Sequence, residues 1–437
     1  DSSINAYEML LSESQERMLL VLKNKSSNKI NKIFKKWGLD SKKIGEVIKE
    51  KRFLIKYKKQ IVVDLPVSLL TDDCPMYKRP VKKPRVKKIK KIDFKKIKTN
   101  EVELKNLVRK VISDPNICSR SWIFEQYDHM VGTDTIVKPG SDSSVIRIKG
   151  TKKALSLTTN CNSNYCYNNP SRGATIAVTE STRNIIASGG KPLAITNCLN
   201  FGNPENKKIM WQFAKSIEGM SKASLMFNTP VVSGNVSLYN ENSKDSIKPT
   251  PVISMVGLID NIKYCRDQFF KNVGDDVILI GKIKNDFGST IISNYYKSFN
   301  NINNCPQINL KSHKKINDFI YKLNRSINIK SIHDISEGGL IVTLFESCFN
   351  PDNLYGVNID LKSLNFNTKL QIFAESQGCY VLSCDNKDSD KIINKALEQK
   401  IYSKKIGKVT KDNFYIKDYF NVSIDNIYKL WSNSFPK

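Results

Sequence analysis

The polar triplet Glu-Ser-Gln stands in two places in the chain, each time just ahead of a short apolar run. It occupies residues 13–15, before an apolar run at 18–22, and residues 375–377, before a run at 380–382. Runs of this kind predict buried strands. Because the triplet and its run recur near both ends, we expect a duplicated unit, in which the front of the chain is the end of an earlier copy of the unit that closes it.

The length and composition are those of a folded, water-soluble protein. A chain of 437 residues has room for roughly three domains, and 40% hydrophobic with 26% charged residues is ordinary for globular proteins. The sequence begins at Asp1, as a processed product or a fragment would, and the apolar run at 18–22 is too short for a signal peptide core or a membrane span. We expect a cytoplasmic protein without a membrane segment.

The cysteines and histidines do not form a recognisable metal motif. The chain has 10 cysteines and 3 histidines, and it contains no CxxC pair. Cys161 and Cys166 are close in sequence, but no common metal motif uses their spacing. We therefore expect most cysteines to be reduced, half-buried small residues.

A formal charge of +28 raises the question of nucleic-acid binding. Most of the excess is Lys, scattered among abundant Asn and Ile, and this pattern is typical of a coding bias. Residues 78–98 are the exception, because they combine many lysines with two prolines and almost no acid. We interpret this segment as a solvated, self-repelling linker, and contact with an acidic partner or RNA is the alternative.

The basic linker divides the chain into a short front part and a long back part. Residues 1–77 predict a helix ending before Gly38 and a strand pair over 53–70, as in the last portion of an α/β domain. From about residue 100 to 262 helices alternate with strands, and a second α/β unit begins near 270. Three polar corners follow strands of the long back part. Ligands of α/β proteins usually bind at such corners.

Two of these corners offer neutral oxygens beside a glycine. Residues 196–205 contain Asn197 and Gly202, although helix capping alone also explains an Asn-rich connection. Residues 231–241 contain Gly234, which lets a phosphate approach the backbone, followed by Asn235 and Ser237, whose oxygens suit Mg²⁺ or phosphate. A plain hairpin turn is the alternative for the second corner.

The third corner gathers His333, Asp334 and Glu337 in the segment HDISEGGL. Acidic residues at a helix start are favourable to the helix dipole without any metal, so a structural role and a functional one are both open. His129 is the other histidine in a plausible pocket-lining stretch, and a lone histidine of this kind is more often structural than catalytic.

Taken in order, these segments resemble the synthetase (large) subunit of phosphoribosylformylglycinamidine synthase, of the short, multi-subunit type. The resemblance covers essentially the whole chain. It is carried by the segments SESQERML, WGLDSKKIGEV, WIFEQYDHMVGTDT, NCLNFGNPE, EGMSKASLMFNTPVVSGNVSLYNE, PTPVISMVGL, HDISEGGL and ESQGCYVL.

The resemblance implies an α/β (α+β) fold made of aminoimidazole ribonucleotide synthetase-like N-terminal and C-terminal domains, with a partial first copy and a complete second copy. The chain then looks like the C-terminal portion of the family's subunit. We expect the end of the first C-terminal domain at 1–77, the basic linker at 78–100, the second N-terminal domain at 101–265 and the second C-terminal domain at 266–437.

The resemblance also implies the reaction, which is ATP-dependent amidation of formylglycinamide ribonucleotide in purine biosynthesis. ATP activates the substrate's amide oxygen and ammonia then attacks, so positioning and charge stabilisation carry the catalysis. The residues it implicates are Glu13, Ser14, Gln15 and Ser237 for the substrate, Asn197 and Gly234 for ATP, and Asn235 for Mg²⁺.

Two departures and one absence bear on activity. The family usually has Asp where this chain has Asn160 and Asn197, and loss of a charge-assisted hydrogen bond costs about 1.5–3 kcal/mol. The family's catalytic His lies in the N-terminal half of the first copy, so we expect no catalytic residue here and no turnover by this chain alone. The implied partners are that missing half and the glutaminase and small accessory subunits that supply ammonia.

Other functions remain open at this stage. A single-copy relative, such as aminoimidazole ribonucleotide synthetase or selenophosphate synthetase, is disfavoured by the repeated triplet. An RNA-binding protein would need aromatic residues among the lysines of 78–98, where only Phe94 qualifies, so nucleic acid is an unexpected partner. The departures at Asn160 and Asn197 also fit a subunit retained as a non-catalytic scaffold.

Overall fold

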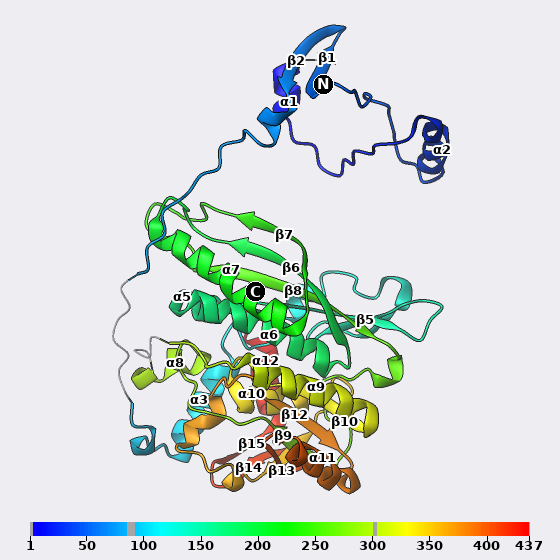
Figure 1. Cartoon of the computed structure of the whole chain (residues 1–437). Helices are drawn as coiled ribbons and strands as arrows, with labels where there is room; N and C mark the ends of the chain where they lie inside the picture. The colour runs from blue at the N-terminus through cyan, green and yellow to red at the C-terminus, as the bar shows by residue number, and fades with distance from the viewer. Residues whose placement is uncertain (1–2, 85–91, 300–303, 437) are drawn as a thin grey trace. The chain divides into compact units, whose positions relative to one another are not determined.

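The computed structural model describes residues 3–84, 92–299 and 304–436, and within these the chain separates into two compact units, Asp1–Lys78 and Arg79–Lys437 (Figure 1). Each unit is described by itself. No helix among the described residues is long and apolar enough to cross a membrane.

The first unit contains short elements, and none of its described side chains is buried. It holds an antiparallel strand pair whose turn, at Lys58 and Lys59, has positive φ angles. The predicted helix before Gly38 and the predicted strand pair are both present. The elements are α1 Ala6–Leu11, η1 Asn24–Ser26, α2 Ser27–Lys36, β1 Arg52–Tyr57, β2 Gln60–Pro66 and η2 Val67–Leu70.

The prediction of a strand at residues 18–22 is wrong. These residues have no regular secondary structure, and Met18 is 87% exposed. The matching run of the second copy does form a strand, because β12 (Tyr380–Cys384) lies between β9 and β10 and is fully buried. The physical difference is the presence of neighbouring strands, since an apolar run gains little from extended structure without a sheet to enter.

The second unit contains a six-stranded sheet in the order β3-β4-β5-β8-β6-β7. Its strands are antiparallel except for the pair β6–β7. The strands are β3 Thr135–Val137, β4 Ser144–Arg147, β5 Ala154–Asn160, β6 Lys191–Asn200, β7 Val231–Ser237 and β8 Thr250–Ile259. The strands on either side of Gly150, β4 and β5, pair antiparallel with each other.

Two long helices cover one face of this sheet, α6 (Pro170–Ala187) and α7 (Lys207–Phe227) (Figure 1). Alternating residues of β8 are buried, and Ile253 and Met255 pack with Ala177 and Met220 of the helices. Removing each such side chain from water stabilises the fold by about 1.5–3 kcal/mol. Helix α6 also contributes Ile186 to a second core, so it connects the two sheets.

The second sheet has seven strands in the order β10-β12-β9-β13-β11-β14-β15. The inner strand β9, third in this order, is buried along its whole length, as a strand covered by helices on both faces should be. The remaining strands are β9 Asp276–Ile280, β10 Ile329–Asp334, β11 Gly356–Ile359, β13 Ser403–Thr410, β14 Asn413–Ile416 and β15 Phe420–Ser423.

Helices on both faces complete this part of the second unit. One core joins α9 to the sheet, and the other joins α3 and α10. The helices are α3 Glu101–Ile112, α4 Ser121–Phe124, α5 Ser163–Asn168, α8 Ile291–Tyr295, α9 Leu310–Ser326, α10 Gly339–Cys348, α11 Asn386–Glu398 and α12 Ile424–Asn433. The 3-10 helices are η3 Phe94–Lys96, η4 Val131–Thr133, η5 Ile262–Tyr264, η6 Lys297–Phe299, η7 Lys362–Leu364 and η8 Lys369–Phe373.

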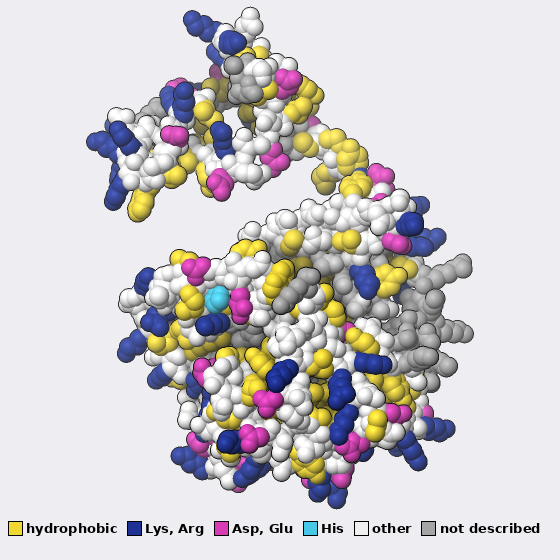
Figure 2. Space-filling model, turned by 180° about the vertical axis from the view of Figure 1, so that it is seen from behind, with side chains coloured by type: hydrophobic (Ala, Val, Ile, Leu, Met, Phe, Trp, Pro, Cys, Tyr) yellow, Lys and Arg dark blue, Asp and Glu magenta, His cyan; other side chains and the backbone are white. Residues whose placement is uncertain are grey.

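The basic side chains are spread over the surface. Figure 2 shows Lys and Arg over the visible face of each unit instead of in a single patch. Part of the predicted linker, residues 85–91, lies outside the described residues. The distribution favours a coding bias over a dedicated surface for a polyanion.

Candidate functional site

The first two polar corners lie on neighbouring parallel strands. Asn197 of β6 is in register with Gly234 of β7, and Asn200 is in register with Ser237. A Cβ atom on Gly234 would overlap the Asn197 side-chain oxygen and lie 2.9 Å from the Asn197 carbonyl oxygen. The close approach therefore requires glycine at this position. The structure brings Asn197, Gly234, Asn235 and Ser237 together at one edge of the sheet.

Hydrogen bonds fix the loops that follow these strands. Asn240 donates from Nδ2 to the Phe201 carbonyl at 3.0 Å and to the Ser237 carbonyl at 2.9 Å. Ser237 Oγ lies 3.1 Å from the same amide nitrogen, so the hydroxyl is held in place. Both loops are thus tied to each other, and Ser237 is preorganised on its strand.

A carboxylate anchors the outer part of these loops. Glu241 accepts hydrogen bonds from Ser246 Oγ at 2.7 Å and from the Asn203 backbone N–H at 3.1 Å. The Ser246 bond, followed by that of Asn203, lowers the pKa of Glu241. Glu241 is therefore a fixed negative charge beside the neutral amides of the strands.

Strand β7 is an exposed edge. It pairs with β6 on one side only, and Val231, Val232 and Val236 are 50%, 69% and 51% exposed. Asn235 is also exposed, so its amide oxygen is available to a ligand. A row of exposed valines on an edge strand is normally covered by another element or chain.

A second group of polar residues is buried inside the second unit. We call it the polar seam, because residues of segment 142–183 there meet residues of segment 333–375. Its contacts are Asp142 with His333 at 2.7 Å, Arg183 with Asp334 at 3.0 Å, Asn162 with Glu337 at 2.7 Å, and Tyr165 with Glu375. The third predicted corner, His333 to Glu337, forms one side of this seam.

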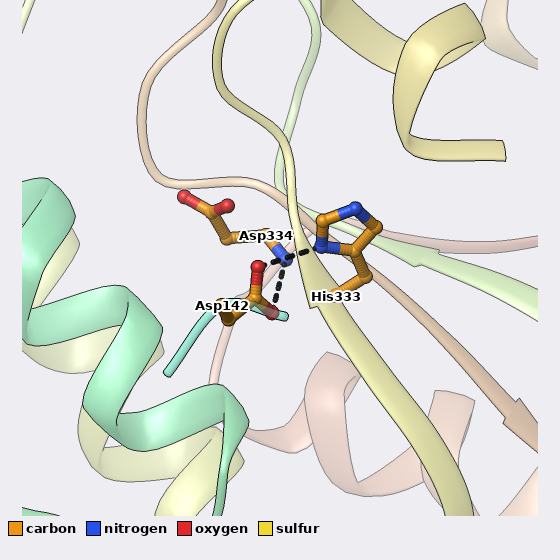
Figure 3. A group of neighbouring side chains, drawn as sticks. All are labelled: Asp142, His333 and Asp334. Atoms are coloured by element: carbon orange, nitrogen blue, oxygen red, sulfur yellow. Dashed lines mark hydrogen bonds and ion pairs between the residues drawn. The ribbon is translucent and has the colours of Figure 1, made fainter. Parts of the chain in front are cut away.

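His333 lies between two carboxylates. Its Nδ1 is 2.7 Å from Asp142 (Figure 3). Its Nε2 is 3.0 Å from Glu346. Burial disfavours the charged imidazolium, but Asp142 and then Glu346 outweigh burial, and the pKa of His333 is raised well above its ordinary value. Both ring nitrogens therefore carry protons at neutral pH, and the ring stabilises the two carboxylates as an ion pair.

The same place contains atoms that could serve as metal ligands. One ligand atom each from Asp142, His333 and Asp334 lies within 4.8 Å of the others (Figure 3). A cation there would have to displace the imidazole proton and compete with Arg183 for Asp334. As it stands, the arrangement is a hydrogen-bonded ion-pair cluster.

The seam contains more buried carboxylates than buried cations. Burial raises the pKa of Asp334 to about 6, of Glu337 and Glu375 to about 7, and of Glu180 to about 8. Arg183 is fully buried, bonded through Nε to Asp334, with Glu180 at 3.8 Å from one terminal nitrogen. Part of this cluster is therefore protonated at neutral pH.

Asn160 connects to the seam through a second amide. With the Asn184 amide oriented to satisfy its neighbours, its oxygen accepts from Asn160 Nδ2 at 3.2 Å and its nitrogen donates to Asp334 at 3.3 Å. Asn160 also donates to Ser181 Oγ at 3.1 Å. This asparagine is thus engaged with other side chains of the unit.

The two copies of the triplet have different surroundings. Glu375 and Ser376 are buried, and Glu375 accepts from the backbone N–H groups of Ile291 and Gly338, both at 2.8 Å. Residues 13–15 of the first unit are exposed, and Gln15 donates to Glu13 at 3.1 Å. Residues 13–15 belong to the first unit, whereas strands β6 and β7 belong to the second.

Sequence reasoning missed half of the seam. Asp142, Glu180 and Arg183 were not among the predicted site residues. A signal was available in α6, where Glu180 and Arg183 stand in a helix that is mostly apolar or small in its side chains, and buried charges are rare without a partner. His129 lies outside the seam and packs edge-on against Phe124 at 6.4 Å, so a structural role fits it.

Comparisons with known proteins match most of the chain. The description "AIR synthase related protein, N-terminal domain" matches residues 140–259, and "AIR synthase related protein, C-terminal domain" matches residues 1–58 and 272–418. The C-terminal domain thus matches at both ends of the chain. This confirms the predicted fold class of synthetase-like domains with a partial first copy.

Two curated relatives are similar over nearly the whole chain. The "Phosphoribosylformylglycinamidine synthase subunit PurL" of Caldanaerobacter subterraneus subsp. tengcongensis is 41% identical over 412 residues, which are 94% of this chain and 55% of the relative. The subunit of the same description from Pelagibacter ubique is 38% identical over 433 residues, 99% of this chain and 59% of the relative. The chain therefore spans somewhat more than half the length of these relatives.

Solved structures give the same relation. PurL of Thermotoga maritima complexed with AMPPCP matches with a TM-score of 0.64 and 25% identity, over 94% of this chain and 58% of that chain. The same protein complexed with FGAR matches with a TM-score of 0.63, over 94% of this chain and 56% of that chain, again at 25% identity. The structure of PurLQS from that organism matches with a TM-score of 0.64, over 94% and 58%, also at 25% identity.

Proposed function

The chain carries both the N-terminal and the C-terminal domain of AIR synthase related proteins, and from this premise we propose that it is part of an ATP-dependent carbon–nitrogen ligase. The reaction is amidation of formylglycinamide ribonucleotide to formylglycinamidine ribonucleotide in purine biosynthesis. Because the chain spans 55–59% of the relatives' length, we assign the activity to an assembly that includes the remaining portion. In this proposal the chain is the C-terminal portion.

The observation that carries the proposal is identity of 38–41% with PurL subunits over almost every residue of the chain. The solved relative has been described in complex with AMPPCP and with FGAR, which supports ATP and this substrate as ligands of the assembly. A single-copy relative is disfavoured, since the C-terminal domain matches at both ends.

We assign the nucleotide to the edge formed by β6 and β7. Asn197 and Gly234 lie side by side there, and the absence of a Gly234 side chain lets the Asn197 side chain lie directly against strand β7. Asn235 would hold Mg²⁺ and Ser237 the substrate. Glu13, Ser14 and Gln15 of the first unit would contact the substrate as well.

The donors at this edge fit Mg²⁺ in type but are uncharged. Asn235 supplies an amide oxygen, which is a ligand that Mg²⁺ accepts, and Glu241 supplies a nearby negative charge. Mg²⁺ would neutralise charge on the ATP phosphates. Mg²⁺ binding would therefore depend on the ATP phosphates as much as on the protein. An uncharged Asn at position 197 makes Mg²⁺ binding depend more strongly on those phosphates.

The chain's own contribution is positioning. The bond from Asn240 holds the Ser237 hydroxyl, and the β6–β7 register holds Asn197 beside Gly234. Transfer of the ATP γ-phosphoryl group to the substrate amide oxygen makes that oxygen a leaving group. Ammonia then attacks the amide carbon and phosphate departs, so correct placement of the reactants carries most of the rate.

We further propose that ammonia reaches the assembly from a glutaminase subunit and a small accessory subunit. The support is that the solved PurLQS structure contains a relative of this chain in a larger complex. The catalytic His is proposed to lie in the remaining portion of the synthetase.

The test is reconstitution with the N-terminal portion of the Caldanaerobacter relative. We expect a labelled AMPPCP to bind with Mg²⁺. In a separate assay with ATP in place of AMPPCP, we expect phosphate release after addition of formylglycinamide ribonucleotide and ammonia only in the mixture. Turnover by this chain alone would contradict the assignment of the catalytic His to the other portion. No binding and no turnover in the mixture would instead favour a non-catalytic scaffold.

A further inference from the structure

One carboxylate oxygen joins the loop that follows β6 to the loop that follows β7. Glu241 Oε2 accepts from Ser246 Oγ at 2.7 Å and from the Asn203 backbone N–H at 3.1 Å. Glu241 and Ser246 also form an isolated antiparallel bridge, which closes the loop after β7 on itself. Loss of this one oxygen would therefore remove a bond within one loop and a bond between the two.

The two loops approach each other closely beside this oxygen. A Cβ on Gly202 would lie 2.7 Å from Ser246 Oγ, so the contact leaves no room for a side chain there. The Tyr239 N–H donates to the Gly202 carbonyl at 3.2 Å, and the Asn240 N–H donates to the Phe201 carbonyl at 3.2 Å. The loops are thus joined through their backbones as well as through the carboxylate.

Tyr239 has a left-handed backbone conformation, which a residue with a side chain rarely adopts. Its φ is 61°. Its side chain is 53% exposed, so hydrogen bonds of the surrounding backbone hold this conformation more than packing of the ring does. A strained residue persists only where its surroundings fix it. The turn from Ser237 to Glu241 therefore depends on the bonds at its two ends.

We propose that Glu241 is a positioning residue, which holds the strained turn at Tyr239 and thereby keeps the Asn240 side chain on Ser237. This inference rests on the proposed function, in which Ser237 contacts the substrate. Asn240 Nδ2 donates to the Ser237 carbonyl at 2.9 Å and to Ser237 Oγ at 3.1 Å. Without the carboxylate oxygen, Tyr239 relaxes to a favourable φ, and Asn240, the next residue, turns away from Ser237.

The place of each residue in the sheet indicates which ligand depends on Glu241. Asn197 and Gly234 lie within β6 and β7 and are held by the register of the strands, so nucleotide binding does not require the turn. Ser237 is the last residue of β7, and its hydroxyl is held by a residue of the turn. Loss of the Glu241 bonds therefore weakens substrate binding and leaves the nucleotide bound.

Two substitutions of Glu241 separate its oxygen from its charge. The amide oxygen of Gln can accept from both donors, because both bonds end on Oε2, whereas Ala accepts from neither. In the reconstituted assembly we expect Glu241→Ala to raise the KM for formylglycinamide ribonucleotide about tenfold, with kcat and AMPPCP affinity within about twofold of the wild type. Glu241→Gln should restore the KM.

Asp245→Ala is the matched control, since Asp245 is an exposed acid of the same loop that is bonded through its backbone. It should leave the KM unchanged. Amide hydrogen exchange gives a readout that needs no turnover and uses the whole chain. The amides of Asn203, Tyr239 and Asn240 should exchange about tenfold faster in Glu241→Ala, and at the wild-type rate in Glu241→Gln.

The failure of this inference differs from the failure of the proposed function. Equal exchange of the three amides in the wild type and in Glu241→Ala would overturn the role of Glu241 in holding the turn. Turnover with an unchanged KM in Glu241→Ala would overturn the positioning role and leave the proposed function standing. No turnover by the assembly with the wild-type chain would contradict the proposed function, and the positioning role would fall with it.

Discussion

At the residue scale, Gly234 is constrained by the side chain across the strand pair. A methyl group at this position would overlap Asn197 Oδ1 and press on the Asn197 carbonyl oxygen at 2.9 Å. We expect Gly234→Ala to lower the free energy of unfolding by about 1–3 kcal/mol, as overpacking does, and to weaken AMPPCP binding in the reconstituted assembly. Denaturant unfolding checks the first effect. Gly45→Ala is the control, because a Cβ there meets open space.

The carboxyl group of Glu375 makes the stability of the fold depend on pH. Burial raises its pKa from 4.5 to about 7, so the folded state keeps a proton that the unfolded state releases between these values. Stability contributed by this group is therefore present at low pH and falls as pH rises through that window. Glu375→Gln keeps an oxygen for the two backbone donors and supplies an N–H toward Tyr165. In the wild type, the free energy of unfolding should fall by at most about 3 kcal/mol as pH rises through this window, and we expect the substitution to remove that fall.

Denaturant unfolding at pH 5 and pH 8 measures this effect. The matched control is Glu218→Gln, because Glu218 is a partly exposed residue whose pKa is lowered to about 2 by Lys215 and Lys222. The control should leave the pH slope between these values unchanged. An equal slope in the wild type and in Glu375→Gln would mean that Glu375 is ionised throughout.

At the element scale, the crossing of α6 and α7 depends on Gly219. A Cβ on this residue would overlap the Ser171 carbonyl oxygen of α6 and lie 2.8 Å from the carbonyl carbon. Alanine favours a helix interior by about 1 kcal/mol over glycine, but the clash is with backbone and can be relieved only by moving the helices. We expect Gly219→Ala to be destabilising by about 1–3 kcal/mol, and Ser221→Ala on the exposed side of α7 to be neutral or stabilising, as thermal unfolding would show.

The elements also show which features the sequence could reveal. Periodicity predicted the alternation of helices and strands from about residue 100 to 262, the stretch that contains α6, α7 and the β4–β5 pair, because the burial patterns of these elements depend on neighbours within the same stretch of chain. The prediction of a strand at 18–22 was wrong because an apolar run forms a strand only where another strand lies beside it. For the same reason the sequence found His333 and Asp334 but not Asp142 and Arg183, since these pairs join positions 191 and 151 residues apart.

At the scale of the whole molecule, one edge of the six-stranded sheet is formed by β7 and exposes apolar side chains. Strand β7 exposes three valines, and the chain spans 55–59% of the length of its PurL relatives. Exposed apolar edges are normally covered. The proposed assembly therefore accounts for the edge if the remaining portion of the synthetase contacts it.

A charge placed on that edge tests this arrangement. Val232 is 69% exposed, so Val232→Lys should change the free energy of unfolding by no more than about 0.5 kcal/mol, as surface substitutions do. If the edge is covered in the assembly, the lysine is desolvated there, and co-purification with the N-terminal portion of the relative should be lost. Val102→Lys is the matched control, since Val102 is 67% exposed and lies on α3. Undiminished co-purification of Val232→Lys would show that the remaining portion binds elsewhere on the chain.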